Sequence, residues 1–308
     1  MTNAVSPNPS QLQSPLQLSN ELAALVAAAA QSVATVHAGG RRPSSGIIWQ
    51  PGIVVTAEET IVRDADLALT LPGGTRVQAT LAGRDPSTDI AVLRYEATPP
   101  AKAFAATPIA TDLRAGHLAV AIGSADGEAV ATLGVVSFAG PAWRSRHGGQ
   151  IDARLIIDAR LPAIAEGGAL VSAGGSLIGM AVFGPRRRVL AIPAATIARV
   201  APVIQDRGHI ARGYLGVGLQ RVPLAAAEGP ETARGAMVVT LDPAGPAKAA
   251  GILQGDIIVR LGGSAVTGLR TLYQQLGSDA VGKKMAVDLI RAGVHKTIDV
   301  TIAPRPQA

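Results

Sequence analysis

Three acidic residues, Glu59, Asp89 and Glu166, each stand beside an apolar run or a glycine pair that predicts a strand or a turn. Carboxylates can act as bases, bind cations or share protons, and the outcome depends on what surrounds them. If the three converge, like charges about 4 Å apart at an effective dielectric of about 20 repel by about 4 kcal/mol per pair. Three outcomes are open: the acids splay into solvent or pair with an arginine such as Arg63 or Arg160, at least one pKa rises, or a cation binds. We favour the first.

Other groups that could carry acyl-transfer chemistry are serines and the five histidines, since the chain has no cysteine. The lack of cysteine excludes thiol catalysis, disulfides and zinc–thiolate sites. A lone histidine is more often structural or solvated than catalytic. No histidine stands in a motif with a serine and an acid; the five are His37, His117, His147, His209 and His295.

Four segments closely resemble the HtrA (DegP/DegS-like) serine endopeptidases. They are Gly83–Leu93, Val120–Gly123, Leu133–Ser137 and Asp158–Leu170. The family's triad aspartate lies in a Gly-x-Asp-x-x-Thr-Asp-Ile-Ala-Val-Leu pattern, and the resemblance assigns Asp89 to it. The family's nucleophilic serine precedes Gly-Gly-x-Leu, which assigns its position to Glu166. Glu59 takes the histidine's position in the segment after Val55-Thr56-Ala57.

The resemblance implies a protease scaffold whose catalytic machinery is degenerate. Acyl transfer needs an oxygen nucleophile, an imidazole base and donors aimed at the oxyanion. Glu166 and Glu59 replace the first two, and Ile164 replaces the family glycine that helps to form the oxyanion hole. We therefore expect a serine-endopeptidase fold that is catalytically inactive. Two alternatives stay open: an active endopeptidase that uses a remote serine and histidine, and a hard-metal site held by the three carboxylates.

The C-terminal part resembles the PDZ domains of HtrA proteins. Gly213–Leu219 is similar to their carboxylate-binding loop and groove strand, and Asp242–Ile258 matches their Pro-Ala-x-x-Ala-Gly-Ile-x-x-Gly-Asp-x-Ile pattern. Such a loop captures a C-terminal carboxylate while the peptide adds as a strand. A second helix is expected at Gly268–Leu276, with groove and core positions that spacing cannot separate. The candidate peptide-binding residues are Gly213, Tyr214, Leu215, Gly216, Val217, Leu219, Leu269, Leu272, Tyr273 and Leu276.

Length and composition suit two domains, with 308 residues of which 48% are hydrophobic. The expected fold is mainly β: a trypsin-like double six-stranded β-barrel followed by an α+β PDZ domain. We expect a disordered N-terminal tail over 1–17, the barrel domain over 18–205 with a first helix at Leu18–Gln31, a hinge over 206–211 and the PDZ domain over 212–304.

The expected partners are peptides or unfolded proteins with hydrophobic C-termini, and the resemblance implies homo- or hetero-oligomers, commonly trimers, with HtrA-like relatives. A net charge of +6 from 28 basic and 22 acidic residues is too small and scattered to indicate nucleic-acid binding. The triplet Arg186–Arg188 is interpreted as a solvated loop tip near the former specificity pocket. We expect no cofactor, metal or membrane span. Without a recognisable signal peptide, the default location is cytoplasmic, although the family is usually extracytoplasmic.

Overall fold

The computed structural model describes residues 14–40, 42–97, 102–104, 112–184, 187–224 and 234–306. Most of the expected N-terminal tail, residues 1–13, therefore lies outside the described residues. The chain divides into two compact units, each described by itself below. The first unit contains Met1–Arg84, Asp89–Pro141 and Ala153–Gln205, and the second contains Asp85–Thr88, Ala142–Asp152 and Asp206–Ala308.

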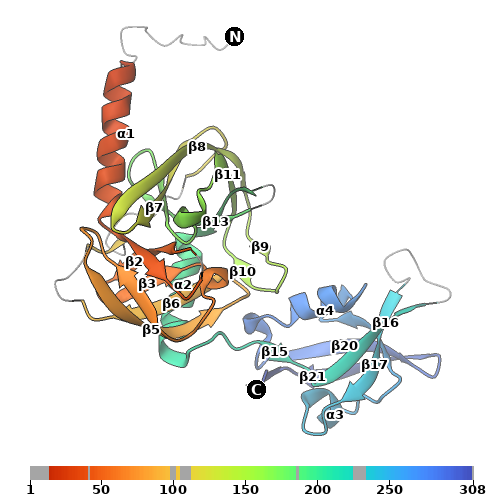
Figure 1. Ribbon diagram of the computed structural model, residues 1–308. Helices are drawn as coiled ribbons and strands as arrows, with labels where there is room; N and C mark the ends of the chain where they lie inside the picture. Colours follow the sequence, from red (N-terminus) through yellow and green to blue (C-terminus); the bar gives the residue numbers. More distant parts are fainter. Residues whose placement is uncertain are drawn as a thin grey trace, which may run out of the picture. The chain divides into compact units, whose positions relative to one another are not determined.

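The first unit begins with a closed six-stranded barrel in the order β1-β2-β3-β6-β5-β4, drawn in red and orange in Figure 1. Runs of Val, Ile, Leu and Ala form these strands because branched side chains pack well on a pleated sheet. Ile48, Val54 and Leu69 are fully buried inside. The strands are β1 (Val33–His37), β2 (Ser44–Gln50), β3 (Ile53–Thr56), β4 (Leu67–Thr70), β5 (Arg76–Asp85) and β6 (Ile90–Tyr95).

A second closed six-stranded barrel follows in the order β11-β14-β13-β12-β7-β8. Its interior is apolar, with Ile157, Leu170 and Val189 almost fully buried. The strands are β7 (Leu118–Ala125), β8 (Glu128–Gly140), β11 (Arg154–Arg160), β12 (Ala169–Ser172), β13 (Leu177–Phe183) and β14 (Arg188–Pro193). The two barrels confirm the predicted trypsin-like part of the fold.

Two helices accompany the barrels. Helix α1 (Pro15–Ala30) packs against β7 and β8. It begins three residues before the expected Leu18, because the Ser14 Oγ accepts a hydrogen bond from the Gln17 N–H at 3.2 Å and Pro15 suits the first helical turn. Helix α2 (Ala194–Arg207) leaves the second barrel, and its last two residues, Asp206 and Arg207, lie within the expected hinge.

The second unit holds a mixed domain built on a sheet in the order β16-β17-β18-β20-β21, with β19 added to β18. Its core includes Val238, Ile258 and Leu289. The sheet strands are β16 (Val217–Pro223), β17 (Arg234–Leu241), β18 (Ile257–Leu261), β19 (Ser264–Ala265), β20 (Lys284–Arg291) and β21 (Val294–Thr301). Strands β15 (Gly213–Tyr214) and β22 (Ala303–Pro304) pair with each other, as do β9 (Trp143–Arg144) and β10 (Gln150–Ile151).

Short helices complete this unit. Helix α3 (Pro246–Ala249) has Pro246 in its first turn, and Gly251 beyond its end adopts a φ of +89°, which glycine tolerates at no steric cost. Helix α4 (Leu269–Gln275) lies within the expected range. Together with the barrels, this α+β domain confirms the predicted fold class.

Candidate functional site

The folded barrels bring the three acidic residues to one place. Glu59 lies in the short 3₁₀ helix η2 (Glu58–Thr60) that follows β3, and Asp89 lies in the turn between β5 and β6. Glu166 follows another 3₁₀ turn, η4 (Ala163–Ala165), directly before the glycine pair that leads into β12. The first barrel thus supplies two carboxyl groups and the second supplies one.

Hydrogen bonds connect the three residues. The Glu59 N–H donates to Asp89 Oδ1 at 3.2 Å, and the Glu58 N–H donates to the Asp89 carbonyl oxygen at 3.3 Å. Asp89 adopts a φ of 57°, a left-handed conformation that aspartate tolerates better than most residues. The carboxyl groups of Glu59 and Glu166 share a side-chain hydrogen bond. Because two carboxylates cannot donate to each other, this bond requires a proton on one of them.

Burial and neighbouring charges raise the pKa of two of these acids. Burial is the main cause that raises the pKa of Asp89 to about 7; charges on Glu59 and Glu58 add to it, and the N–H groups of the same two residues oppose it. The pKa of Glu166 rises to about 8, first because of burial and then because of the hydrogen bond and charge of Glu59. The Phe183 N–H bonds to Glu166 and partly offsets this rise. This rise favours the protonated form of Glu166 at neutral pH.

Protonation relieves the repulsion that the sequence predicted. The sequence favours acids that point into solvent or pair with arginine, and the structure differs from this expectation. In the described part of the chain, neither Arg63 nor Arg160 forms an ion pair with any of the three acids. The three acids can lie close together because a shared proton removes one negative charge. This protonation costs little when the groups are partly shielded from water.

The same acids do not form a recognisable metal centre. Among the described residues, no group of three or more His, Cys, Asp or Glu side chains has an arrangement that could hold a metal ion. One oxygen of the pair, Glu166 Oε1, is buried and has no hydrogen-bond partner in the described structure. An unpaired oxygen of this kind favours the neutral, protonated form of the group.

Backbone hydrogen bonds hold the segment before Glu166 in a 3₁₀ turn. The Ala165 N–H donates to the Pro162 carbonyl oxygen at 2.9 Å, and the Glu166 N–H donates to the Ala163 carbonyl oxygen at 3.4 Å. Ile164 accordingly has a helical backbone, which suits a β-branched residue better than unusual dihedral angles would. The Glu166 N–H is thus used within its own turn.

Ser45 of β2 fastens this turn from the opposite barrel. Its Oγ donates to the Ile164 carbonyl oxygen at 2.6 Å and accepts from the Ser124 N–H at 2.8 Å. Its own N–H donates to the Glu166 carbonyl oxygen at 2.8 Å. The chain that carries Glu166 is therefore attached to both barrels.

The glycine pair after Glu166 is required by close packing. Gly167 has a φ of +80°, and a Cβ there would lie 2.4 Å from the Ser45 carbonyl oxygen. A Cβ on Gly168 would lie 2.2 Å from the Ile122 carbonyl oxygen. Both distances are far inside van der Waals contact, so only glycine lets β12 begin where it does.

The histidines do not join the acid cluster. His37 Nε2 lies 2.9 Å from Thr70 Oγ1, and burial first, then the Arg76 charge, lowers the pKa of His37. The Nδ1 of His147 contacts the Pro86 carbonyl oxygen at 3.2 Å, and that of His209 contacts the Arg207 carbonyl oxygen at 2.9 Å. These contacts agree with structural roles.

In the second unit, hydrogen bonds hold the segment that the sequence predicts to bind a carboxylate. The Tyr214 hydroxyl donates to Asp242 Oδ2 at 2.9 Å, the Ala247 N–H donates to the Leu215 carbonyl oxygen at 2.9 Å, and the Asp242 N–H donates to the Gly216 carbonyl oxygen at 2.9 Å. These bonds hold the loop's backbone in a fixed shape. A rigid backbone is what allows successive N–H groups to receive a carboxylate.

Two features next to this loop resemble a peptide groove. Strand β16 is at the edge of its sheet, which leaves one side of its backbone for an added strand, and α4 lies beside it.

Gly216 has a φ of +74°, and a Cβ there would lie 2.8 Å from the Cα of Gly245. Any larger residue at Gly216 would therefore shift the loop.

Burial separates the candidate groove residues, which spacing alone could not do. Leu215, Leu272 and Leu276 belong to the buried core of the domain. Val217, Leu219 and Leu269 pack against that core but keep part of their surface, and Tyr273 is 52% exposed. The accessible apolar surface beside β16 therefore comes from the second set, and Gly213 is buried behind the loop.

Comparisons with known proteins agree with both halves of the chain. A trypsin-like peptidase domain matches residues 44–180, and a PDZ domain matches residues 213–302. A probable periplasmic serine endoprotease, DegP-like, from Brucella suis is 34% identical over 284 residues, which cover 87% of this chain and 54% of the relative. A DegP-like relative from Rhizobium meliloti is 30% identical over 278 residues, with coverage of 86% and 54%.

Solved structures give the same result. The serine endoprotease from Yersinia pestis has a TM-score of 0.69 at 27% identity, over 96% of this chain and 100% of that one. The HtrA-type protease AlgW with a tripeptide has a TM-score of 0.66 at 27% identity, over 93% and 98%. The chain belongs to the HtrA family. It spans about half the length, 54%, of the curated HtrA-like relatives that it matches.

Within this HtrA-family chain, two groups at the acid cluster escaped prediction. Ser45 belongs to the first barrel, and its hydrogen bonds to Ile164 and Ser124 of the second barrel depend on how the two barrels pack together. The Phe183 N–H bonds to Glu166 from β13, and no motif in the sequence connects that strand with the site.

None of the helices that the structure describes combines the length and the apolar composition that a membrane span requires.

Proposed function

We propose that this HtrA-family protein does not cleave peptide bonds and instead binds unfolded chains or C-terminal peptides as a scaffold, chaperone or regulator. The observation that carries the proposal is the hydrogen bond between Glu59 and Glu166, at the positions that the resemblance assigns to the catalytic base and the nucleophile. A pair of carboxyl groups that share a proton cannot perform either role.

The chemistry of the cluster supports this reading. The raised pKa of Glu166 favours its protonated form at neutral pH, and a protonated carboxyl group is a poor nucleophile. Even as a carboxylate, it would have to form an anhydride with the peptide. The Glu166 N–H, which would help to stabilise an oxyanion, donates to Ala163 within the 3₁₀ turn. Nucleophile, base and oxyanion donor are therefore all compromised.

Peptide binding is assigned to the PDZ domain. We propose that a C-terminal carboxylate meets the N–H groups of Leu215 and Gly216 while the peptide lies along the free edge of β16. The Gly213 N–H is not part of this set, because it donates to the Leu276 carbonyl oxygen at 3.0 Å. The partly exposed Val217, Leu219 and Leu269 favour a hydrophobic last residue. Oligomers with itself or with active relatives are part of the proposal, since a binder without cleavage could modulate such relatives.

The catalytic part is tested with casein as substrate and a serine-reactive phosphonate as probe. We expect no cleavage and no labelling at neutral pH, and the Glu166→Ala variant should behave in the same way. Cleavage that disappears in Glu166→Ala but persists in Glu96→Ala, a change at an exposed acid of the same barrel domain, would refute the proposal. Labelling of a serine located by mass spectrometry would favour the alternative of an unorthodox endopeptidase.

The binding part is tested separately with a C-terminal peptide library on the full chain. Peptides that end in Val, Leu or Ile should bind, and the same peptides with amidated C-termini should not. Gly216→Val should abolish binding, because its side chain would collide with Gly245. Equal binding of free and amidated peptides would contradict recognition by the loop.

A further inference from the structure

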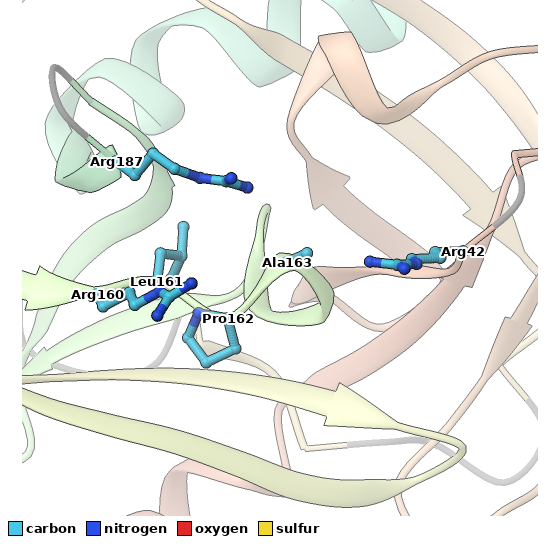
Figure 2. Close-up of a pocket in the computed structure, with 6 residues that line it drawn as sticks. All are labelled: Arg42, Arg160, Leu161, Pro162, Ala163 and Arg187. Carbon is cyan, nitrogen blue, oxygen red and sulfur yellow. The ribbon is translucent and has the colours of Figure 1, made fainter.

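A pocket of about 480 Å³ lies on the barrel domain, next to the segment that leads to Glu166. Three parts of the chain surround it: the loop between β1 and β2, the end of β11 with the turn that follows, and the residue before β14. Figure 2 shows the described residues that line it: Arg42, Arg160, Leu161, Pro162, Ala163 and Arg187.

The pocket is strongly positive. Among the lining residues that the structure describes, three are arginines and none is acidic. Arg42 and Arg187 extend toward the pocket from opposite sides, and the guanidinium group of Arg160 lies beside Pro162 (Figure 2). None of the three forms an ion pair with a residue that the structure describes. Three cations that face one space without a counter-charge repel each other, and a bound anion would remove that repulsion.

The position of Arg187 is fixed by its surroundings. Its φ is 59°, unusual for a residue other than glycine, and its N–H donates to the Gly184 carbonyl oxygen at 3.1 Å. Its guanidinium carbon lies 5.3 Å from the centre of the Phe183 ring, within the range of a cation–π contact. The neighbouring Arg188 is different, because it pairs with Asp158 at 3.3 Å and does not line the pocket.

We propose that this pocket binds a phosphate group. Arginine presents a planar fork of donors that matches phosphate and carboxylate oxygens in pairs. A phosphate monoester carries between one and a half and two negative charges at neutral pH and offers three acceptor oxygens. A carboxylate offers one charge and two oxygens, so it would balance less of the positive charge of the three guanidinium groups.

The location of the pocket adds to the argument. Ala163, at its edge, begins the turn that ends before Glu166, and Phe183 carries both the Arg187 contact and the N–H bond to Glu166. Because the protonated form of Glu166 is favoured at neutral pH, its carboxyl group does not repel an anion held nearby. The pocket shares no residue with the candidate peptide groove, so this inference stands apart from the proposed function.

The phosphate could be free or could belong to a phosphoserine side chain, and calorimetry on the full chain distinguishes the two. One arm uses inorganic phosphate, and the other uses a short phosphoserine peptide with an amidated C-terminus, which the PDZ loop cannot capture by its carboxylate. Both are run at constant ionic strength in chloride. The same peptide with serine or glutamate in place of phosphoserine serves as the comparison.

We expect saturable one-site binding of at least one phosphate probe. Arg160→Ala and Arg187→Ala should each weaken it about tenfold or more, since each removes a charge-assisted hydrogen-bond donor. Arg188→Ala, which removes the same charge one residue away, should leave the affinity within about twofold of the original. Unchanged melting temperatures in the arginine variants would exclude unfolding as the cause.

Each outcome decides a point. Binding of inorganic phosphate indicates a free anion, and binding of the phosphopeptide alone indicates a modified chain as the ligand. The proposal is overturned if neither probe binds, if the pocket variants bind as well as the original chain, or if the glutamate peptide binds as tightly as the phosphopeptide.

Discussion

The carboxyl groups of Glu59 and Glu166 share a hydrogen bond across the junction of the two barrels. A contact of this kind holds only while one group keeps its proton. It therefore makes the stability of the barrel domain depend on pH. Stability decreases as the pH rises, whereas an acid in an ordinary salt bridge makes stability increase with pH.

The first prediction concerns this pH dependence. The pKa of Glu166 is raised from 4.5 to about 8 and that of Asp89 from 3.8 to about 7, so the folded state holds these protons more tightly than the unfolded state does. Their contribution to stability is complete below the unfolded pKa values of 3.8 and 4.5 and is lost progressively until the pH has risen through the folded values of about 7 and about 8. The melting temperature should therefore fall as the pH rises through this range.

Glu166→Gln provides the check, since its amide can donate to Glu59 at every pH. The variant should show a flatter decline and a higher melting temperature than the original chain on the alkaline side. Glu128→Gln, at an exposed acid that begins β8, is the matched control and should keep the original slope. A melting temperature that rises toward alkaline pH would show that Glu166 and Asp89 are ionised in the folded protein.

The second prediction concerns the glycines after Glu166. Gly167→Ala should lower the free energy of unfolding by about 2–4 kcal/mol, because it combines a left-handed backbone with a collision against Ser45. Gly73→Ala is the control, with a φ of +83° against +80° and nothing within 4 Å of the added Cβ. It should cost about 1 kcal/mol. The free energy of unfolding is measured by urea denaturation. Equal losses in the two variants would mean that the residues around Gly167 move to accept the added Cβ at no cost.

The third prediction separates two neighbouring residues of α4. Leu272 is fully buried, so Leu272→Ala should destabilise the PDZ domain by about 2–5 kcal/mol. Tyr273 is 52% exposed, so Tyr273→Ala should change stability by less than about 0.5 kcal/mol. Thermal denaturation measures the first effect. If Tyr273 faces a bound peptide, its replacement weakens peptide affinity without changing the fold, and an unchanged affinity would remove it from the groove.

The fourth prediction concerns a buried ion pair. Asp256 is 1% exposed and accepts two hydrogen bonds from Arg291, at 2.8 and 2.7 Å, and one from the Leu253 N–H at 2.8 Å. Asp256→Ala should cost about 2–4 kcal/mol, because it strands these donors. Asp299→Ala breaks the exposed pair with Lys284 and should cost less than about 1 kcal/mol. Similar losses of unfolding free energy in the two variants would contradict the claim that the buried Asp256 pair stabilises the domain more than the exposed Asp299 pair.

Several features of the fold could be predicted from local sequence alone. Pro246 and Gly251 bracket a helix because each suits one end of it, and the apolar runs near Val54 and Leu170 form strands because they can be buried on a sheet. The acid positions were also predictable, since the motifs around Asp89 and Glu166 are continuous. These are properties of short stretches of chain.

The remaining features depend on contacts between distant segments. Proton sharing by Glu59 and Glu166 requires their approach and their partial burial, neither of which a motif encodes. The roles of Leu272 and Tyr273 follow from which side of α4 meets the sheet. The predicted loop tip at Arg186–Arg188 illustrates the same limit: Arg186 lies outside the described residues, Arg187 lines a pocket with Arg42 and Arg160, and Arg188 pairs with Asp158.

Ser45 uses its hydroxyl group as donor and acceptor at once, and both partners, Ile164 and Ser124, belong to the opposite barrel. If either barrel opens locally near Ser45, the hydrogen bonds from Ser45 to the other barrel break. We therefore expect the pair of barrels to melt in a single calorimetric transition, as one cooperative block rather than as two independently folding halves.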